Sequence, residues 1–134
     1  MNISIAQIVE TLEHVVGKDI ELAYLFGSHA INRANKHSDI DIAILPHAPV
    51  TAETIWQWAQ HMAAQLGKDV DLINLMDCNT VLRMQIVQEG QLLLDRNNKA
   101  PSFETDTYRM YQDLQFSRQG NLDAFKQRWI ETNR

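Results

Sequence analysis

The chain has 134 residues and a net charge of −5, with 17 acidic residues against 12 Lys and Arg. This length predicts a single domain over residues 1–134, and an apolar content of 45% is enough for a hydrophobic core. Proteins that bind nucleic acids usually carry a concentrated basic surface, so the acidic balance argues against DNA or RNA as the main substrate. A small nucleotide is not excluded, because metal ions can neutralise its phosphates.

The sequence carries no targeting or membrane-spanning pattern. Its first ten residues lack the basic start and the continuous apolar run of a secretory signal, and no apolar stretch is long enough to cross a bilayer. The single cysteine, Cys78, cannot form an internal disulfide, and we expect it to be a small buried apolar residue. These features predict a cytoplasmic protein.

Apolar residues recur at helical spacing in some segments and alternate with polar residues in others, which predicts a mixture of helices and strands. In chain order, the predicted elements are a helix at 5–16, strands at 20–26 and 39–45, a helix at 51–66, a strand at 69–75, a helix at 79–89, a strand at 91–95 and a helix at 103–131. Such an order is typical of an α/β (α+β) fold, in which a mixed β-sheet is flanked by helices.

The C-terminal part of the chain is set apart by its composition. Residues 96–102 are polar and include a proline, which predicts a linker. This linker separates a core at about 20–95 from a C-terminal helical segment at about 103–132. Gly120 and Asn121 predict a break within that segment, because both residue types are poor helix formers.

Two aspartates, Asp39 and Asp41, lie two residues apart at the start of the second predicted strand. Side chains two apart on a strand point to the same face, so both carboxylates face one side while Ile40 and Ile42 face the core. Neighbouring carboxylates repel each other unless a cation lies between them, and Mg²⁺ takes oxygen ligands from carboxylates and substrate phosphates. The pair therefore predicts a metal site.

A third aspartate, Asp71, occupies the same kind of position in the next alternating segment. If that strand lies beside the strand of Asp39 and Asp41, a third carboxylate joins the site. Two cations about 4 Å apart could then stabilise both the attacking and the leaving oxygen of an in-line displacement. Asp69 shares a face with Asp71 but lies at the strand edge beside Lys68, so we expect it to be solvated.

Gly27 and Ser28 follow the first predicted strand directly. Glycine lets the backbone approach a phosphate closely, and exposed N–H groups at a helix start favour anions. The Ser28 hydroxyl can add a hydrogen bond to a phosphate. Because phosphoryl and nucleotidyl transfers need mostly positioning and charge neutralisation, this turn and the aspartates together predict a nucleotide-transfer site.

A Gly-Ser pair, ten residues and then Asp-x-Asp is the signature of the polymerase-β-like nucleotidyltransferase superfamily. This chain resembles that superfamily through Gly27-Ser28, Asp39 and Asp41, and Asp71 stands where the family carries its third acidic residue. Its short length resembles the minimal nucleotidyltransferases (MNT) encoded beside HEPN proteins in prokaryotic toxin–antitoxin pairs. The resemblance covers roughly residues 20–95 and implies a polymerase-β-like fold.

For that subgroup, the resemblance implies an antitoxin that forms a complex with a HEPN ribonuclease toxin. It implies the use of ATP and Mg²⁺, with two ions expected, to attach AMP to a tyrosine of the toxin, in several successive units. Asp39, Asp41 and Asp71 would be the catalytic and metal-binding residues, and Gly27 and Ser28 would bind the nucleotide phosphates. Asp71 would also take the proton of the acceptor hydroxyl, whose pKa of about 10 requires activation.

The phosphate loop departs from the family pattern. Many relatives continue after the serine with a pattern like Arg-Ala-Arg-Gly, whereas this chain has His-Ala-Ile-Asn at 29–32. Arg33 and Lys36 are candidates to replace the missing arginines, and His29 is a candidate for a contact with the nucleotide.

Two alternative functions remain open at this point. The first is a nucleotidyltransferase whose acceptor is an RNA end or a small hydroxylated molecule such as an aminoglycoside. The second is a toxin-binding module without catalysis, whose nucleotide site is vestigial. The chain has no extra domain for an acceptor, so the acceptor must dock largely on the outside of the fold, which favours a protein. Three neighbouring carboxylates without a metal would repel each other and serve no function, which argues against a vestigial site.

Aromatic residues occur in two helical segments. Trp56 and Trp58 fall on different faces of one predicted helix, so at most one belongs wholly to the core. The C-terminal segment carries Tyr108, Tyr111, Phe116, Phe125 and Trp129. Core packing is the first expectation for these residues, and the alternative is a surface that docks the toxin, since aromatic residues are common interface anchors.

Overall fold

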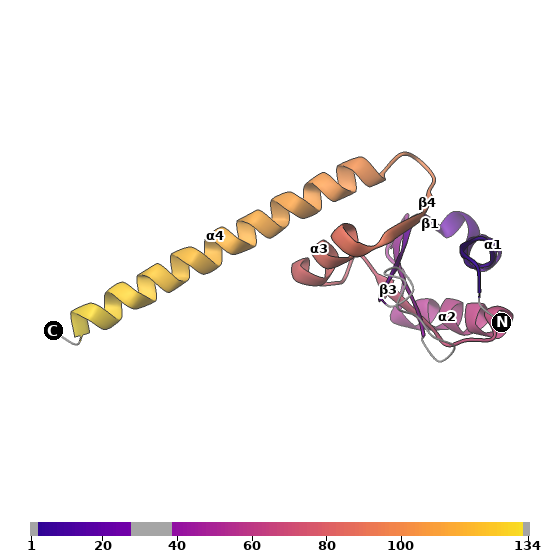
Figure 1. Ribbon diagram of the computed structural model, residues 1–134, viewed down its shortest axis with the longest axis horizontal. Coiled ribbons are helices and arrows are strands. Elements are labelled where there is room, and N and C mark those ends of the chain that lie inside the picture. Colours follow the sequence, from indigo (N-terminus) through magenta and orange to yellow (C-terminus); the bar gives the residue numbers. More distant parts are fainter. Residues whose placement is uncertain (1–2, 28–38, 133–134) are drawn as a thin grey trace.

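The computed structural model of the protein describes residues 3–27 and 39–132, with side-chain environments as far as residue 118. The elements in these ranges are α1 (Ile5–Val15), the 3-10 helix η1 (Gly17–Asp19), β1 (Ile20–Phe26), β2 (Ile40–Pro46), α2 (Ala52–Leu66), β3 (Val70–Asn74), α3 (Thr80–Glu89), β4 (Gln91–Asp95) and α4 (Ala100–Thr132). This order confirms the predicted α/β (α+β) fold, in which helices flank a mixed sheet (Figure 1).

The four strands form one sheet in the order β3–β2–β1–β4. β1 pairs antiparallel with both β2 and β4, whereas β2 pairs parallel with β3. A parallel pair needs a crossover connection, which α2 provides between β2 and β3. β1 and β2 are therefore paired on both sides and form the centre of the sheet.

Helices cover both faces of this sheet (Figure 1). On one face, which we call the α1–α2 face, α1 and α2 pack on Ile40, Ile42 and Ile44 of β2. On the other, the α3–α4 face, α3 and the start of α4 pack on Leu22 and Tyr24 of β1. The expectation that Ile40 and Ile42 face the core is confirmed, since both side chains are fully buried.

The ends of the helices follow from local sequence. Ser4 and Gln7 form a capping box at the start of α1, and the Thr51 side chain accepts a hydrogen bond from the Thr54 N–H at the start of α2. Gly67 ends α2 in the left-handed conformation, with a φ of +70°. These signals explain why the first two helices were predictable from the sequence.

The C-terminal helix departs from the prediction in two ways. α4 begins at Ala100, inside the predicted linker, because the Asp95 carboxylate accepts hydrogen bonds from the N–H groups of Lys99 (2.7 Å) and Ala100 (3.0 Å). The predicted break is also wrong, because α4 continues through Gly120 and Asn121. A glycine costs a helix only about 1 kcal/mol, which an otherwise regular helix tolerates. Of the described helices, none has both the length and the apolar content that a membrane span requires.

Contacts that we call the α4 anchor hold the first turns of α4 to α3 and β1. Arg83 donates a hydrogen bond from Nε to Thr107 Oγ1 (2.6 Å), and its guanidinium lies 4.0 Å from the centre of the Phe103 ring. The Tyr24 hydroxyl donates to Glu104 Oε1 (3.3 Å), and the rings of Tyr24 and Phe103 are 6.3 Å apart. Beyond this anchor, α4 projects far from the sheet (Figure 1).

The exposure of the aromatic side chains reflects how α4 and α2 are placed in the fold. Tyr108 is 43% exposed and Phe116 is 79% exposed, so core packing is the wrong expectation for both. The side chains of Phe125 and Trp129 are not among those that the structure describes. On α2, Trp58 packs partly against the core whereas Trp56 is 63% exposed, which confirms that at most one of the pair belongs to the core.

Replacing Asp95 with alanine removes the acceptor for two N–H groups at the start of α4. We expect the free energy of unfolding to fall by about 1 kcal/mol, the usual cost of a lost N-terminal cap. Urea denaturation followed by circular dichroism measures this change. Asp113→Ala, at an exposed position of the same helix, is the control and should change stability by less than about 0.5 kcal/mol. An equal loss in the two variants would contradict the capping role.

Candidate functional site

The predicted acidic residues come from two neighbouring strands. Asp41 of β2 and Asp71 of β3 are direct partners in the parallel ladder, where strands lie about 4.8 Å apart. Asp39 lies one residue before β2, so the predicted strand 39–45 begins one residue too early. Next to it, the Ile40 N–H donates to the Asp69 carbonyl (2.9 Å), which joins the two chain segments at this end. The structure thus brings β3 and its carboxylate beside the Asp-x-Asp strand.

Asp41 and Asp71 both lie on the α3–α4 face. Side chains alternate along a strand, and each aspartate precedes by two positions a residue that packs on that face, Ala43 and Ile73 respectively. Asp41 is half-buried, whereas Asp39 and Asp71 are exposed. Asp41 and Asp71 therefore lie side by side at one end of this face, and the exposed Asp39 precedes Asp41 by two residues.

Gly27 follows the last residue of β1 and lies directly against the Asp41 side chain. The antiparallel register pairs Phe26 with Asp41, and Gly27 follows with a φ of +72°. A Cβ atom at this position would overlap with the Asp41 carboxylate, so the close approach of the two segments requires glycine. The structure therefore brings Gly27 and Asp41 together.

The remaining part of the predicted phosphate loop, with Ser28, His29, Arg33 and Lys36, lies outside the described residues. The predicted contacts of Ser28 and of the basic residues with nucleotide phosphates stay predictions.

The chemistry of the donors suits a hard divalent cation. Mg²⁺ in proteins usually takes one or two carboxylates and completes its shell with water and substrate phosphates. Among the residues that the structure describes, no three His, Cys, Asp or Glu side chains are grouped so that they could hold an ion by themselves. Asp39, Asp41 and Asp71 are nevertheless oxygen donors of the kind that Mg²⁺ takes together with a nucleotide.

Tyr24 links β1 to α4 as a neutral hydrogen-bond donor. Burial raises the pKa of its hydroxyl well above the usual value, and the neighbouring Glu104 acts in the same direction. Burial also lowers the pKa of the Arg83 guanidinium in the same cluster. At neutral pH Tyr24 stays protonated, so it supports the fold and does not act as a base.

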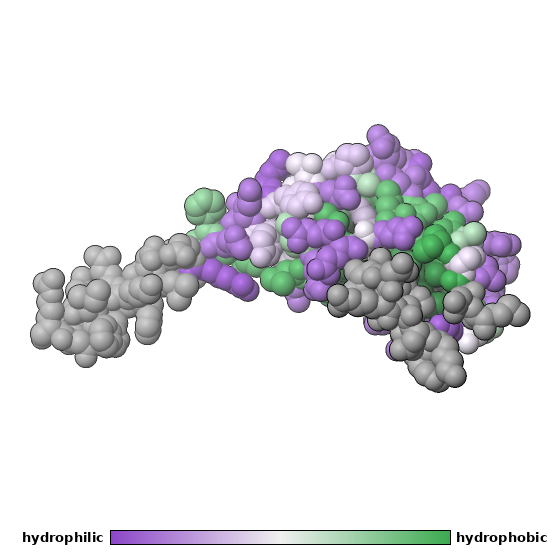
Figure 2. Space-filling model, viewed as in Figure 1, coloured by the Kyte–Doolittle hydropathy of each residue, from purple (hydrophilic) through white to green (hydrophobic). Residues whose placement is uncertain are grey.

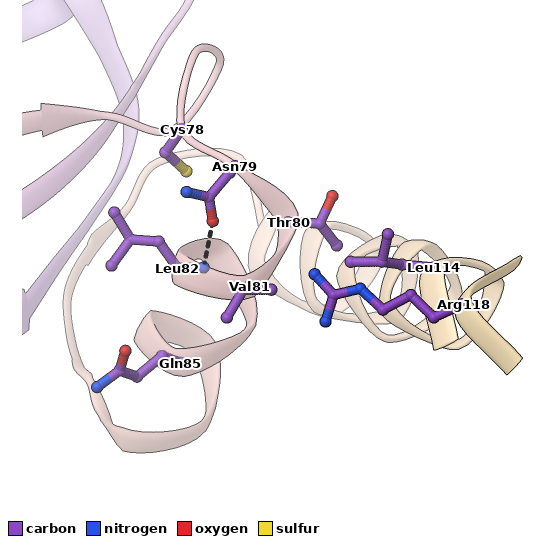
Figure 3. Close-up of a pocket in the computed structure, with 8 residues that line it drawn as sticks. All are labelled: Cys78, Asn79, Thr80, Val81, Leu82, Gln85, Leu114 and Arg118. Atoms are coloured by element: carbon purple, nitrogen blue, oxygen red, sulfur yellow. Dashed lines mark hydrogen bonds between the residues drawn. The ribbon is translucent and has the colours of Figure 1, made fainter. Parts of the chain in front are cut away.

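A groove of about 740 Å³ lies on the molecule between the start of α3 and the middle of α4 (Figure 3). It is lined by Cys78, Asn79, Thr80, Val81, Leu82, Gln85, Leu114 and Arg118. Cys78 was expected to be a buried apolar residue, but it is only half-buried, because it lies in the loop before α3. Its partial burial raises the pKa of the thiol. The sequence did not reveal this groove, because its two walls come from distant segments and no motif marks either wall.

Comparison with known protein families gives a match over most of the chain. Residues 6–99 match the family described as polymerase beta, nucleotidyltransferase. This match begins in α1 and ends just before α4, so it extends on both sides of the range 20–95 expected from the motifs.

Individual relatives are similar over nearly the whole length. The protein adenylyltransferase MntA of Shewanella oneidensis is 37% identical over 117 residues, which are 87% of this chain and 84% of that protein. A crystal structure of a toxin–antitoxin with AMP-PNP contains a chain with a TM-score of 0.79 and 36% identity, over 90% of this chain and 97% of that one. A structure of a tri-AMPylated Shewanella oneidensis HEPN toxin in complex with MNT antitoxin gives a TM-score of 0.72 and 35% identity, over 89% and 92%.

Gly27→Ala tests the close contact between β1 and the Asp41 carboxylate. The new methyl group must displace that carboxylate, and alanine also pays about 1 kcal/mol for the left-handed conformation. Gly67 is a matched control, because its φ is +70° and a Cβ atom there would meet nothing within 4 Å. We expect Gly27→Ala to lower the free energy of unfolding by at least about 1 kcal/mol more than Gly67→Ala does, in urea titrations. Equal losses would show that Gly27 and Asp41 are not packed as described.

Proposed function

The chain belongs to the polymerase β nucleotidyltransferase family, and we propose that it transfers AMP from ATP to a tyrosine of a cognate HEPN toxin, which neutralises that toxin. The observation that carries this proposal is the meeting of three chain segments at one end of the sheet. Asp41 is paired with Asp71 on one side and packed against Gly27 on the other. This arrangement supports a site in which carboxylates bind a metal beside a turn that binds phosphates.

In the proposed reaction, the tyrosine oxygen attacks the α-phosphorus of ATP. The bond between the α-phosphorus and the bridging oxygen breaks, and pyrophosphate leaves. Asp71, exposed at the start of β3, accepts the proton of the tyrosine hydroxyl. Gly27 leaves room for the triphosphate to approach the backbone, and Ser28 donates a hydrogen bond to it. Asp39 and Asp41 would hold the metal ion that accompanies the nucleotide.

Mg²⁺, as two ions, is the proposed cofactor. Asp39 and Asp41 would hold it, with Asp71 as a third ligand, and the nucleotide phosphates would complete the shell. When bound, Mg²⁺ neutralises phosphate charge and stabilises the negative charge that develops on the transferred group.

The relatives support the choice of nucleotide and acceptor. The similar Shewanella oneidensis protein is named a protein adenylyltransferase, and similar chains have been solved in a toxin–antitoxin with AMP-PNP and in a complex with a tri-AMPylated HEPN toxin. We extend to this chain the use of ATP, a HEPN partner and the transfer of several AMP units. We place the reaction in the cytoplasm, where the single cysteine needs no oxidising environment.

The test is AMP transfer to the proposed HEPN partner, followed by intact-protein mass spectrometry. The wild-type protein with ATP and Mg²⁺ should add AMP to a tyrosine, and EDTA should abolish the reaction. Asp39→Asn, Asp41→Asn and Asp71→Asn should each lower the rate by at least about a hundredfold, because metal binding or proton transfer is lost. Asp77→Asn, an exposed position beyond the other end of β3, is the matched control and should retain the wild-type rate.

The other outcomes separate the alternatives. Neutralisation of the toxin that persists in an Asp39→Asn plus Asp41→Asn variant, with no AMP on the toxin from the wild-type protein, would leave a binding module. Label that appears on RNA or on an aminoglycoside would replace the protein acceptor. Full activity of the single Asp71→Asn variant would remove Asp71 from the site and leave the role of the other two aspartates standing.

A further inference from the structure

The groove between α3 and α4 is built from two antiparallel helix surfaces. Val81 and Leu82 on α3 and Leu114 on α4 are its apolar lining residues, and Val81 is 44% exposed. Figure 3 shows Val81 and Leu82 projecting from α3 and Leu114 from α4. Two packed helices leave such a channel along their line of contact, and a third helix can fill it.

The α4 side of the groove continues the face that anchors this helix. Ala100, Phe103 and Thr107 lie at helical spacing and are almost fully buried against the body of the protein. Tyr111 and Leu114 follow at the same spacing but are only half-buried. The face that packs against this chain at the start of α4 therefore becomes accessible further along. Figure 2 shows small hydrophobic patches among polar residues where α3 adjoins α4.

One end of the groove is positively charged. Arg118 is the single charged residue among those that line it, and its side chain extends from α4 toward the first turn of α3 (Figure 3). The positive end of the α3 dipole lies at the same place, where Asn79 caps the helix. The chain as a whole carries a net charge of −5, so this is a local departure from its acidic character. A carboxylate is the group that complements this end of the groove.

From these features we propose that the α3–α4 groove is the docking surface for the HEPN partner, occupied by an amphipathic helix of that protein. Apolar side chains of the helix would pack on Val81, Leu82 and Leu114, and an acidic side chain would pair with Arg118. The identity of the partner rests on the proposed function. The shape and charge of the groove determine the kind of segment that it binds.

The groove is separate from the reacting atoms. It begins at Cys78, beyond the end of β3, whereas Asp71 lies near the start of that strand. From Asp71 to Asn74, the last residue of β3, the strand runs for three steps of about 3.3 Å, or about 10 Å, before the turn that leads to Cys78. Both nevertheless lie on the α3–α4 face, so one protein can contact both. Loss of a groove contact should then raise the KM for the partner and leave kcat unchanged.

The experiment measures binding in a background without catalysis. Asp39→Asn plus Asp41→Asn serves as the parent, and its affinity for the proposed HEPN partner is measured by titration calorimetry. Arg118→Glu and Val81→Glu should each raise Kd by at least about tenfold, because each places a negative charge in the groove. Arg109→Glu is the matched control, since this exposed arginine of α4 makes only a weak surface pair with Asp106 (3.7 Å) and does not line the groove. Its Kd should stay within about twofold of the parent, and thermal melts confirm that all variants are folded.

The results separate this inference from the proposed function. Weaker binding by the groove variants supports the docking surface even when the wild-type protein transfers no AMP, and in that case only the proposed function fails. An unchanged Kd in both groove variants, or no binding by the parent, overturns the docking surface. If sedimentation shows that the groove variants lose self-association while partner binding persists, the occupant is a second copy of this chain and the proposal is wrong.

Discussion

The parallel register between β2 and β3 is the constraint on which the site depends, because it places Asp41 opposite Asp71. Carboxylates on adjacent strands repel each other, and that repulsion works against the pairing unless a cation or solvent screens it. The opposing force comes from the other face of the same strand, where Ile40 and Ile42 are fully buried. A slip by one residue would expose both isoleucines and turn Asp41 toward the core, so hydrophobic burial on one face fixes the charges on the other.

The strands that carry the acidic residues were predictable because their signal is local. Alternation around Asp41 and Asp71 indicates both the strand and the face of each side chain. The order of the strands was not predictable in the same way, because alternation does not specify a neighbour. The start of α4 was missed for a related reason. It depends on Asp95, a residue of β4 whose side chain caps a helix that the polar, proline-containing sequence does not indicate.

The α4 anchor connects the projecting helix to the strand that ends at the site. The Phe103 ring contacts both the guanidinium of Arg83 and the ring of Tyr24, a β1 residue that precedes Gly27 by three positions. These are contacts of a packed interior, which has little freedom to deform. The direction of α4 is thereby set relative to the site, although α4 itself contributes no residue to the acidic group. Residues that are far apart in the sequence make these contacts, so no periodic sequence pattern indicates where α4 leaves the body of the protein. For this reason the pattern of α4 alone suggested core packing for Tyr108 and Phe116.

A division of tasks follows from this geometry. The acidic residues lie at one end of the α3–α4 face, and Asp39 and Asp71 are exposed, so an acceptor held on another molecule can reach them. An exposed site gives little selectivity by itself, because selectivity for one acceptor requires contacts that a competitor lacks. The outer surface of the fold can supply those contacts. The rigidly anchored α4 and its groove with α3 provide such a surface on the same face. On the proposed function, the sheet performs the transfer while these two helices choose the acceptor, so the choice can change without disturbing the pairing of Asp41 with Asp71.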